Sequence, residues 1–204
     1  MTAKYRLSLV SELTPTFYHR SVHEVARDLI GCTVAHRDTA GVIVETESYH
    51  ADDAACHAFG GLTERNRVLF GPPAHAYVYR SYGIHSMLNF VAEPEGDAAA
   101  VLIRALEPVR GIDLMRARRG VERVEELCSG PGKLTQALGI GLDLNGVPLE
   151  SGPIRVFDRA GEWLDPEIVT GPRIGITKAA ELPWRFCAAG SRFVSRPRPV
   201  LAEA

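Results

Sequence analysis

Lysine is nearly absent from this chain of 204 residues, and arginine takes its place. Only Lys4, Lys133 and Lys178 stand against twenty arginines, yet the formal net charge is −2 at pH 7. Arginine forms paired hydrogen bonds with carboxylates and phosphates, which lysine does not. The near-neutral total argues against a surface coated with positive charge for non-specific nucleic-acid binding, but it leaves a local basic face open.

Paired cysteines and long apolar runs are also missing. The four cysteines have no CxxC spacing, so neither a disulfide framework nor a zinc knuckle is indicated for Cys32, Cys56, Cys128 and Cys187. We expect reduced, mostly buried thiols in a cytoplasmic protein, associated with the nucleoid if its source is bacterial. The opening residues MTAKYRLSLV lack the apolar run of a signal peptide, and no segment reaches transmembrane length, so we expect no membrane contact.

The remaining composition, 46% hydrophobic and 24% charged, predicts one domain over residues 1–204, with residues 1–15 as a lead-in. A capping box of Ser21 and Glu24 predicts a helix over residues 21–30. Further helices are expected at 109–118 and from Ser129 to Leu138, and strands at 32–37, 42–48, 76–81, 87–92, 99–106, 153–157, 173–177 and 186–187. Because the elements follow no regular βαβ rhythm, we expect an α+β fold: a single compact domain with a curled, largely antiparallel sheet, surrounding helices and a protruding β-hairpin.

Residues 41–57, GVIVETESYHADDAACH, combine a strand pattern with unusual polarity. Side chains alternate along a strand, so Glu45, Glu47 and Tyr49 share one face. Burying two carboxylates and a phenol is costly without partners. The face is therefore either a site of chemistry or the solvated side of an edge strand.

Arg104 in VLIRALEP is a second charge inside an apolar strand. A buried guanidinium needs a carboxylate, and Glu45 and Glu47 are the candidates. The alternatives are pairing with Glu107 or exposure at the strand end.

Aromatic residues gather in AYVYRSYG. Tyr77 and Tyr79 share a strand face, where their rings are either core or a platform for a ligand. Tyr82 directly precedes Gly83 at the expected hairpin tip. An exposed aromatic ring in that place could wedge between stacked bases.

Three other kinds of site are weakly indicated. The cluster of His50, Asp52, Asp53, Cys56 and His57 invites a zinc or iron site, but it lacks the HExxH and HxE…CxxC spacings. A serine triad lacks its usual GxSxG elbow. The SGPGK segment at residues 129–133 is not a full P-loop, although the start of a helix there could hold one phosphate.

Six segments in order resemble one family closely, the alkyladenine (3-methyladenine) DNA glycosylases of the mammalian type. They are VETESY at 44–49, His57 followed by GGLTERNR, YVYRSYG at 77–83, Asn89, VLIRALEP at 101–108 and LCSGPGKLTQAL at 127–138. The resemblance implies a monofunctional base-excision repair enzyme that flips a damaged purine out of duplex DNA and hydrolyses its N-glycosidic bond. It implies no cofactor, a monomer, and double-stranded DNA containing damaged purines as the partner.

The resemblance also implies roles for individual residues. Glu47 matches the general base that activates water, and Arg104 matches the arginine that helps to hold that water and carboxylate. Tyr49, His57 and Tyr79 match the walls that stack on the flipped base, and Asn89 matches the residue that discriminates against the amino group of guanine. Tyr82 matches the side chain that fills the gap in the helix, and the implied DNA-backbone contacts are Thr63, Arg65, Gly83 and Lys133.

The segment from Tyr49 to His57 is one residue shorter than in the mammalian members, and the loop after Gly61 is also trimmed. Arg80 and Ser81 replace an apolar pair. These departures surround the expected pocket, so they bear on the substrate range among 3-methyladenine, 7-methylguanine, hypoxanthine and ethenoadenine. Two rival functions stay open: a damage-binding module without catalysis, and a nucleotide-processing metalloenzyme built on residues 52–57.

Overall fold

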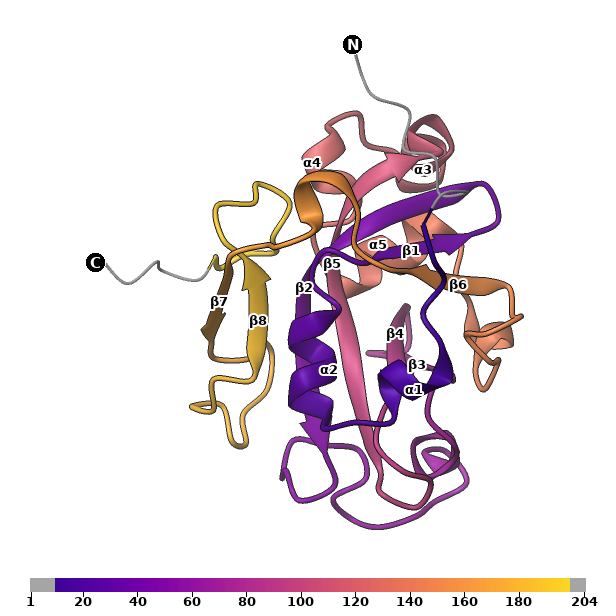
Figure 1. The fold of residues 1–204 in the computed structure, drawn as a ribbon, viewed down its shortest axis with the longest axis vertical. Coiled ribbons are helices and arrows are strands. Elements are labelled where there is room, and N and C mark those ends of the chain that lie inside the picture. The colour runs from indigo at the N-terminus through magenta and orange to yellow at the C-terminus, as the bar shows by residue number, and fades with distance from the viewer. Residues whose placement is uncertain (1–9, 199–204) are drawn as a thin grey trace.

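The computed structural model describes residues 10–198, and its central element is strand β2 (Thr39–His50). One edge of β2 pairs with β5 (Ala99–Arg110), while the other edge pairs first with β1 (Thr33–His36) and then with β8 (Arg185–Ala188). The alternative of a solvated edge strand is therefore wrong, because β2 has neighbours on both sides (Figure 1).

The sheet is antiparallel at every pairing between its named strands, and its order is β3-β4-β5-β2-β1-β6. The remaining strands are β3 (Ala76–Ser81), β4 (His85–Val91), β6 (Ile154–Phe157) and β7 (Ile168–Gly171), the last paired with β8. The predicted α+β fold in a single compact domain with a curled antiparallel sheet is confirmed.

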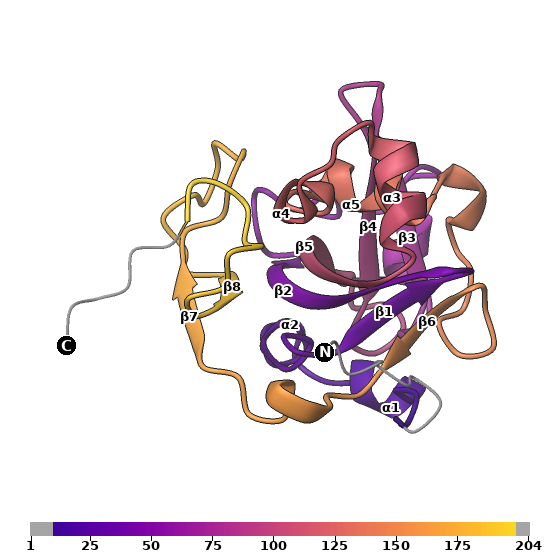
Figure 2. The same cartoon turned by 90° about the horizontal axis from the view of Figure 1, so that it is seen from above.

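Helices cover both faces of the sheet, as Figure 2 shows. Helices α1 (Pro15–Tyr18) and α2 (Val22–Asp28) lie on one face, and α3 (Ile112–Arg119), α4 (Val124–Leu127) and α5 (Pro131–Leu138) on the other. Three short 3₁₀ helices complete the described chain: η2 (Arg67–Phe70), η3 (Leu142–Leu144) and η4 (Gly161–Trp163).

The core forms where these layers meet. Val22, Val25 and Leu29 of the α2 region are fully buried together with Ile43 of β2 and Ile103 of β5. The helix stripe predicted over residues 21–30 thus packs on the sheet. The predicted capping box does not form, because Ser21 makes no side-chain cap hydrogen bond and Glu93 Oε1 accepts the Val22 N–H at 2.9 Å instead.

Two predicted elements differ from the structure. The helix expected at 109–118 is present but begins only at Ile112, because β5 runs on to Arg110 and Gly111 turns the chain at φ +72°. A side chain at Gly111 would meet the Asp38 carbonyl, so this turn requires glycine. The strand expected at 173–177 is an irregular loop, and the nearby strand β7 ends at Gly171.

The ladder between β2 and β5 is irregular at one place. Ile43 pairs with Leu106, Glu45 with Ala105 and Thr46 with Ile103, so Val44 and Arg104 have no Cα partner in this ladder. Bulges of this kind re-aim side chains and are frequent beside active sites. The irregularity lies at the two charged residues, Glu45 and Arg104, that the sequence singles out.

Candidate active site

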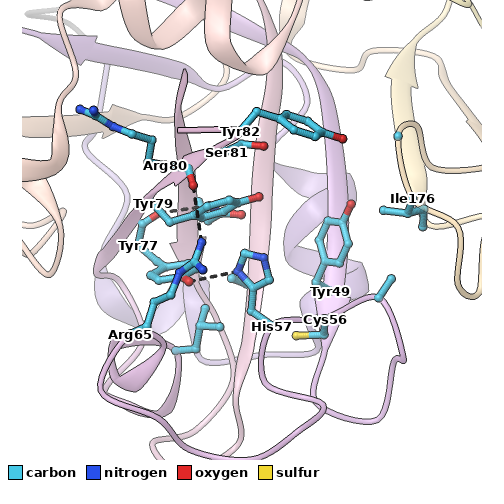
Figure 3. A pocket seen from close by; sticks show the side chains of 15 residues that line it. Tyr49, Cys56, His57, Arg65, Tyr77, Tyr79, Arg80, Ser81, Tyr82 and Ile176 are labelled. Atoms are coloured by element: carbon cyan, nitrogen blue, oxygen red, sulfur yellow. Dashed lines mark hydrogen bonds between the residues drawn. The ribbon is translucent and has the colours of Figure 1, made fainter. Parts of the chain in front are cut away.

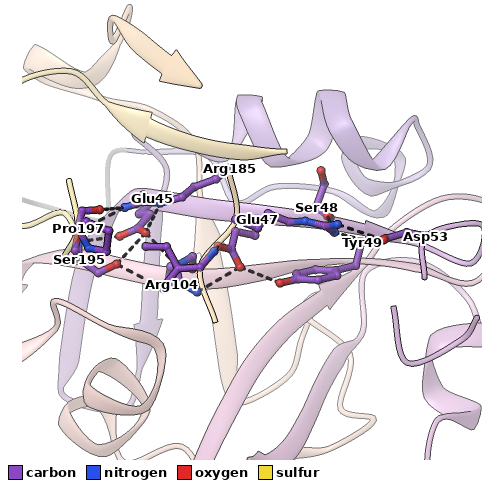
Figure 4. A network of polar contacts seen from close by, with 11 residues as sticks. Glu45, Glu47, Ser48, Tyr49, Asp53, Arg104, Arg185, Ser195 and Pro197 are labelled. Carbon is purple, nitrogen blue, oxygen red and sulfur yellow. Dashed lines mark hydrogen bonds and ion pairs between the residues drawn. The ribbon is translucent and has the colours of Figure 1, made fainter. Parts of the chain in front are cut away.

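Glu45 and Glu47 lie on the same side of β2 and have no exposed surface (Figure 4). Arg104 of β5 bridges them: its Nε donates to Glu45 Oε1 at 2.9 Å, and its Nη1 donates to Glu47 Oε2 at 3.1 Å. These two carboxylates, rather than Glu107 or solvent, are the partners of Arg104. A buried guanidinium shared by two carboxylates forms a tightly coupled network.

Glu45 is surrounded by donors from the C-terminal part of the chain. Arg185 Nε donates to its Oε1 at 2.8 Å, and the Ser195 backbone N–H donates to its Oε2 at 2.7 Å. Burial acts to raise the pKa of the Glu45 carboxyl, but Arg104, Arg185 and Ser195 together lower it below its usual value. Glu45 is therefore an ionised anchor that ties β2, β5, β8 and residues 195–197 together.

Glu47 has fewer cationic neighbours. Its Oε1 accepts the Ile174 backbone N–H at 2.7 Å, and its Oε2 accepts the Tyr49 hydroxyl at 2.8 Å as well as Arg104. Burial raises the pKa of the Glu47 carboxyl above its usual value, although Arg104 and these hydrogen bonds act against the shift. A carboxylate with a raised pKa is a stronger base, as proton abstraction requires.

A cavity of about 280 Å³ adjoins this network at Tyr49 (Figure 3). Tyr49 stands on one side, and Tyr77, Tyr79 and His57 stand on the other. The Tyr77 and Tyr79 ring centroids are 5.4 Å apart, and the His57 ring packs edge-on against Tyr79 at 4.5 Å. The further lining residues include Cys56, Arg65, Asn89, Gly175 and Ile176. The tyrosines are thus a platform facing an open space as well as part of the packing.

Local bonds hold the polar residues of this wall. His57 Nδ1 lies 3.1 Å from the Tyr77 hydroxyl, and Asn89 Nδ2 donates to the Tyr77 carbonyl at 3.1 Å. Burial, and secondarily the charge of Arg65, lowers the pKa of His57. Since the ordinary value is already near 6.5, His57 is a neutral ring at neutral pH.

Tyr82 lies at the tip of the β3–β4 hairpin, where it borders the cavity and is 90% exposed. Its φ of +49° is uncommon for a bulky residue, and Gly83 follows at +74°. The neighbouring Ile84 is exposed as well. The predicted hairpin therefore presents the Tyr82 ring and the Ile84 side chain to solvent, in the positive-φ conformation that a tight hairpin turn requires.

Arg173 is a site residue that the sequence pattern did not single out. It forms a fully buried ion pair with Asp53, donates to the Ser48 carbonyl at 3.0 Å, and places its guanidinium 4.6 Å from the centre of the Tyr49 ring. The same guanidinium lies 5.0 Å from the Trp184 ring centre. A lone arginine in the apolar stretch RIGIT was the available signal, the same kind that marks Arg104.

The predicted DNA-backbone residues fall in four places. Arg65 borders the cavity and Gly83 shares the hairpin tip with Tyr82. Thr63 is exposed in the loop before η2, where its hydroxyl accepts the Asn66 N–H at 3.3 Å. Lys133 is exposed on α5 and lies in a separate groove beside Arg104. The structure therefore brings only part of this set to the cavity.

The candidate metal cluster of residues 50–57 does not converge. Asp53 pairs with Arg173 and His57 contacts Tyr77. Across residues 10–198, no three His, Cys, Asp or Glu side chains gather in a way that could hold a metal ion. All four cysteines are buried and free. In the same part of the chain, we find no helix with the length and apolar character needed to cross a membrane.

Comparison with known proteins shows which family the chain belongs to. The family described as methylpurine-DNA glycosylase matches residues 16–192. A protein of Rhodopseudomonas palustris strain HaA2 is 61% identical over 181 residues, which are 89% of each chain. A protein of Methanoculleus marisnigri is 56% identical over 189 residues, which are 90% of this chain and 98% of the other. Both are provisionally named 3-methyladenine DNA glycosylase. This chain therefore belongs to the methylpurine-DNA glycosylase family of N-glycosidic bond hydrolases.

Proposed function

We propose that this DNA glycosylase flips alkylated or deaminated purines out of duplex DNA and hydrolyses the N-glycosidic bond with a water activated by Glu47. The observation that carries the proposal is the contact between Glu47 and Tyr49. It joins a buried carboxylate of raised pKa to the wall of an aromatic cavity. The proposed substrates are 3-methyladenine, 7-methylguanine, hypoxanthine and ethenoadenine.

The size and lining of the cavity suit a single base. Its volume of about 280 Å³ is just below the roughly 300–1,000 Å³ typical of pockets for drug-sized ligands. Tyr49 faces Tyr79 and His57 across it. Aromatic faces stack on any purine and attract an electron-poor or cationic one more strongly. Because His57 is neutral, it adds no repulsion against a cationic alkylated base.

Base flipping needs a group that stabilises the vacated duplex. Extruding a base costs a few kcal/mol, least for a damaged pair, and an inserted side chain offsets the lost stacking. Tyr82 is exposed at the hairpin tip and also borders the cavity. It therefore fills the gap in the helix while the base enters beside it.

The chemical step uses the chain's own carboxylate. As the bond between the base and C1′ breaks, the sugar gains oxocarbenium character, and ionised Glu47 stabilises this charge and removes a proton from water attacking the opposite face. The proposed outcome is inversion at C1′ without a covalent enzyme intermediate. Because Glu47 has no exposed surface, either the Tyr49 side chain or the loop carrying Ile174 must move before the water can reach the carboxylate.

Arg104 and Asn89 have supporting roles in this proposal. Arg104 holds the Glu47 carboxylate in its ionised form and in place. Asn89 lines the cavity with its amide held by the Tyr77 carbonyl, so it presents a rigid edge that the amino group of normal guanine meets.

The test uses duplex oligonucleotides that each carry one 3-methyladenine, hypoxanthine or ethenoadenine. After incubation, alkali cleaves the strand wherever a base has been released, and an undamaged duplex is the control. We expect cleavage at the lesion without cleavage before alkali, as a monofunctional enzyme requires. Tight binding to the lesion without any release would identify a damage-binding module instead. Release that stops on chelation would support the metalloenzyme.

A further inference from the structure

A second hollow, which we call the basic groove, lies between the α4–α5 region and residues 192–198. Its volume is about 810 Å³. Six cationic side chains border it: Arg104, Arg123, Lys133, Arg192, Arg196 and Arg198. The chain as a whole carries a net charge of −2, so this concentration of positive charge is local.

The two carboxylates of the groove do not neutralise it. Glu126 pairs with Arg123 at 3.2 Å, and Glu125 pairs with Arg192 at 3.3 Å. Lys133 and Arg196 have no carboxylate partner among residues 10–198, and Arg198 donates only to the Arg192 carbonyl within the same range. Three exposed cations are therefore available to an anionic ligand.

One wall of the groove allows a close approach. Gly130 lies at φ +152°, in a conformation open only to glycine, and carries no side chain into the hollow. The residues on either side, Ser129 and Pro131, are small or rigid, and α5 begins at Pro131. A phosphate backbone can lie against such a wall within reach of Lys133.

Arg104 links the basic groove to the candidate active site through buried side chains. Arg104 borders the groove and donates to Glu47, and Glu47 accepts the hydroxyl of Tyr49 in the base cavity. Figure 4 shows this chain of contacts running from Ser195 and Pro197 at one end to Tyr49 at the other.

The β3–β4 hairpin packs against α5, the helix that borders the basic groove. A side chain at Gly132 would come within 3.0 Å of His85, so α5 packs closely on the root of the hairpin that carries Tyr82. Thr135 of α5 also donates to the Ser86 carbonyl of β4 at 2.8 Å. The helix that borders the groove therefore packs directly on the root of the hairpin that carries Tyr82.

We propose that the basic groove binds the sugar–phosphate backbone of the damaged strand, and that Arg196 and Arg198 are phosphate contacts together with Lys133. The inference rests on the proposed function, because its occupant is the DNA whose base enters the cavity. Duplex DNA presents one negative charge per about 1.7 Å of helix axis, a density that three unpaired cations in one groove complement. Both arginines lie beyond residues 16–192, the part that the family matches.

The salt dependence of binding tests the groove. A double variant, Arg196→Gln with Arg198→Gln, is titrated with a duplex carrying an abasic-site analogue between about 50 and 200 mM salt. We plot the logarithm of the association constant against the logarithm of the salt concentration. Each lost phosphate contact is expected to make the slope of this plot shallower by about 0.9. The matched Arg196→Lys and Arg198→Lys double variant keeps the charges and is expected to retain most of the slope.

Arg27→Gln is the control for removal of an exposed arginine elsewhere, since Arg27 lies on α2 at the opposite face of the sheet. Thermal melting checks that each variant is folded. If the wild type excises damaged bases but the glutamine variants keep its salt slope, the groove proposal is overturned and the proposed function stands. If the wild type neither binds the duplex nor releases a base, the proposed function itself fails.

Discussion

Glu45 and Glu47 lie two residues apart on β2 and share the guanidinium of Arg104, yet their carboxyl pKa values are displaced in opposite directions. The two pKa values differ because the contacts other than Arg104 differ between the two carboxylates. Arg185 and Ser195 add a cation and hydrogen bonds to Glu45, whereas Glu47 receives only the neutral donors of Ile174 and Tyr49. Glu45 is thereby held as an ionised structural carboxylate, whereas Glu47 keeps the higher basicity that its proposed role as general base needs.

Replacing Glu47 by glutamine tests the catalytic assignment. General base catalysis contributes about 10²–10⁴-fold, so we expect single-turnover base release by Glu47→Gln to fall by about that factor. Binding to a duplex with an abasic-site analogue should persist, because Tyr49 and Tyr82 are unchanged. Base release at the wild-type rate would remove Glu47 from the mechanism.

Replacing Glu45 by glutamine tests whether its ionised carboxylate stabilises the fold. The change leaves Arg104 and Arg185 buried with less negative charge, and breaking a buried pair typically destabilises by about 3–5 kcal/mol. We expect urea unfolding to show a loss of that order at pH 7. The matched control is Glu122→Gln, an exposed partner of Arg116, which should change the unfolding free energy by no more than about 0.5 kcal/mol.

The pH dependence of stability has opposite signs for the two carboxyls. Because the pKa of Glu45 is lowered in the fold, its contribution is complete above the ordinary value of 4.5 and is lost as pH falls through the lowered value. The raised pKa of Glu47 acts the other way, and its burial costs stability as pH rises through and above 4.5. We therefore expect Glu45→Gln to flatten the acid limb of the stability profile and Glu47→Gln to increase stability at neutral pH. Both expectations are tested by measuring the midpoints of urea unfolding between pH 3 and 8 for the two variants and the wild type.

The buried pair of Arg173 and Asp53 is expected to position Tyr49. Arg173→Gln and Asp53→Asn should each destabilise the fold and slow base release, while the double variant should lose less than the sum, because each single change strands a charge. Trp184 fluorescence gives a local readout, since Arg173 lies against that ring as well. Additive losses in the double-mutant cycle would show that the two residues act independently.

Tyr82 offers a prediction in which stability and function separate. The side chain is 90% exposed, so Tyr82→Ala should leave the unfolding free energy within about 0.5 kcal/mol. Stacking on a base is worth about 1–3 kcal/mol, and we expect affinity for lesion-containing duplex to fall accordingly. Leu164→Ala, at an exposed apolar position away from the hairpin, is the control. Equal affinities for all three proteins would exclude insertion of Tyr82.

Much of the architecture could be predicted because it depends on local patterns. The alternation of side chains places Glu45 and Glu47 on one face, and the pair Tyr82 and Gly83 marks the hairpin tip. The helix predicted at 109–118 starts three residues later than expected for a physical reason: Arg110 still belongs to β5, where it pairs with Ala40 of β2, and Gly111 then ends the strand. At Arg110, strand pairing outweighs the local propensity for a helix.

The sequence by itself determined the strand that carries the carboxylates, the arginine that faces them and the aromatic residues of the cavity wall. The tertiary structure alone decided which carboxylate is the anchor, because Glu45 receives Ser195 from 150 residues further along the chain. It also decided that Arg173 supports Tyr49 and that residues 192–198 complete a basic groove. No short-range spacing encodes these contacts, since they depend on loops that come together only when the sheet has formed.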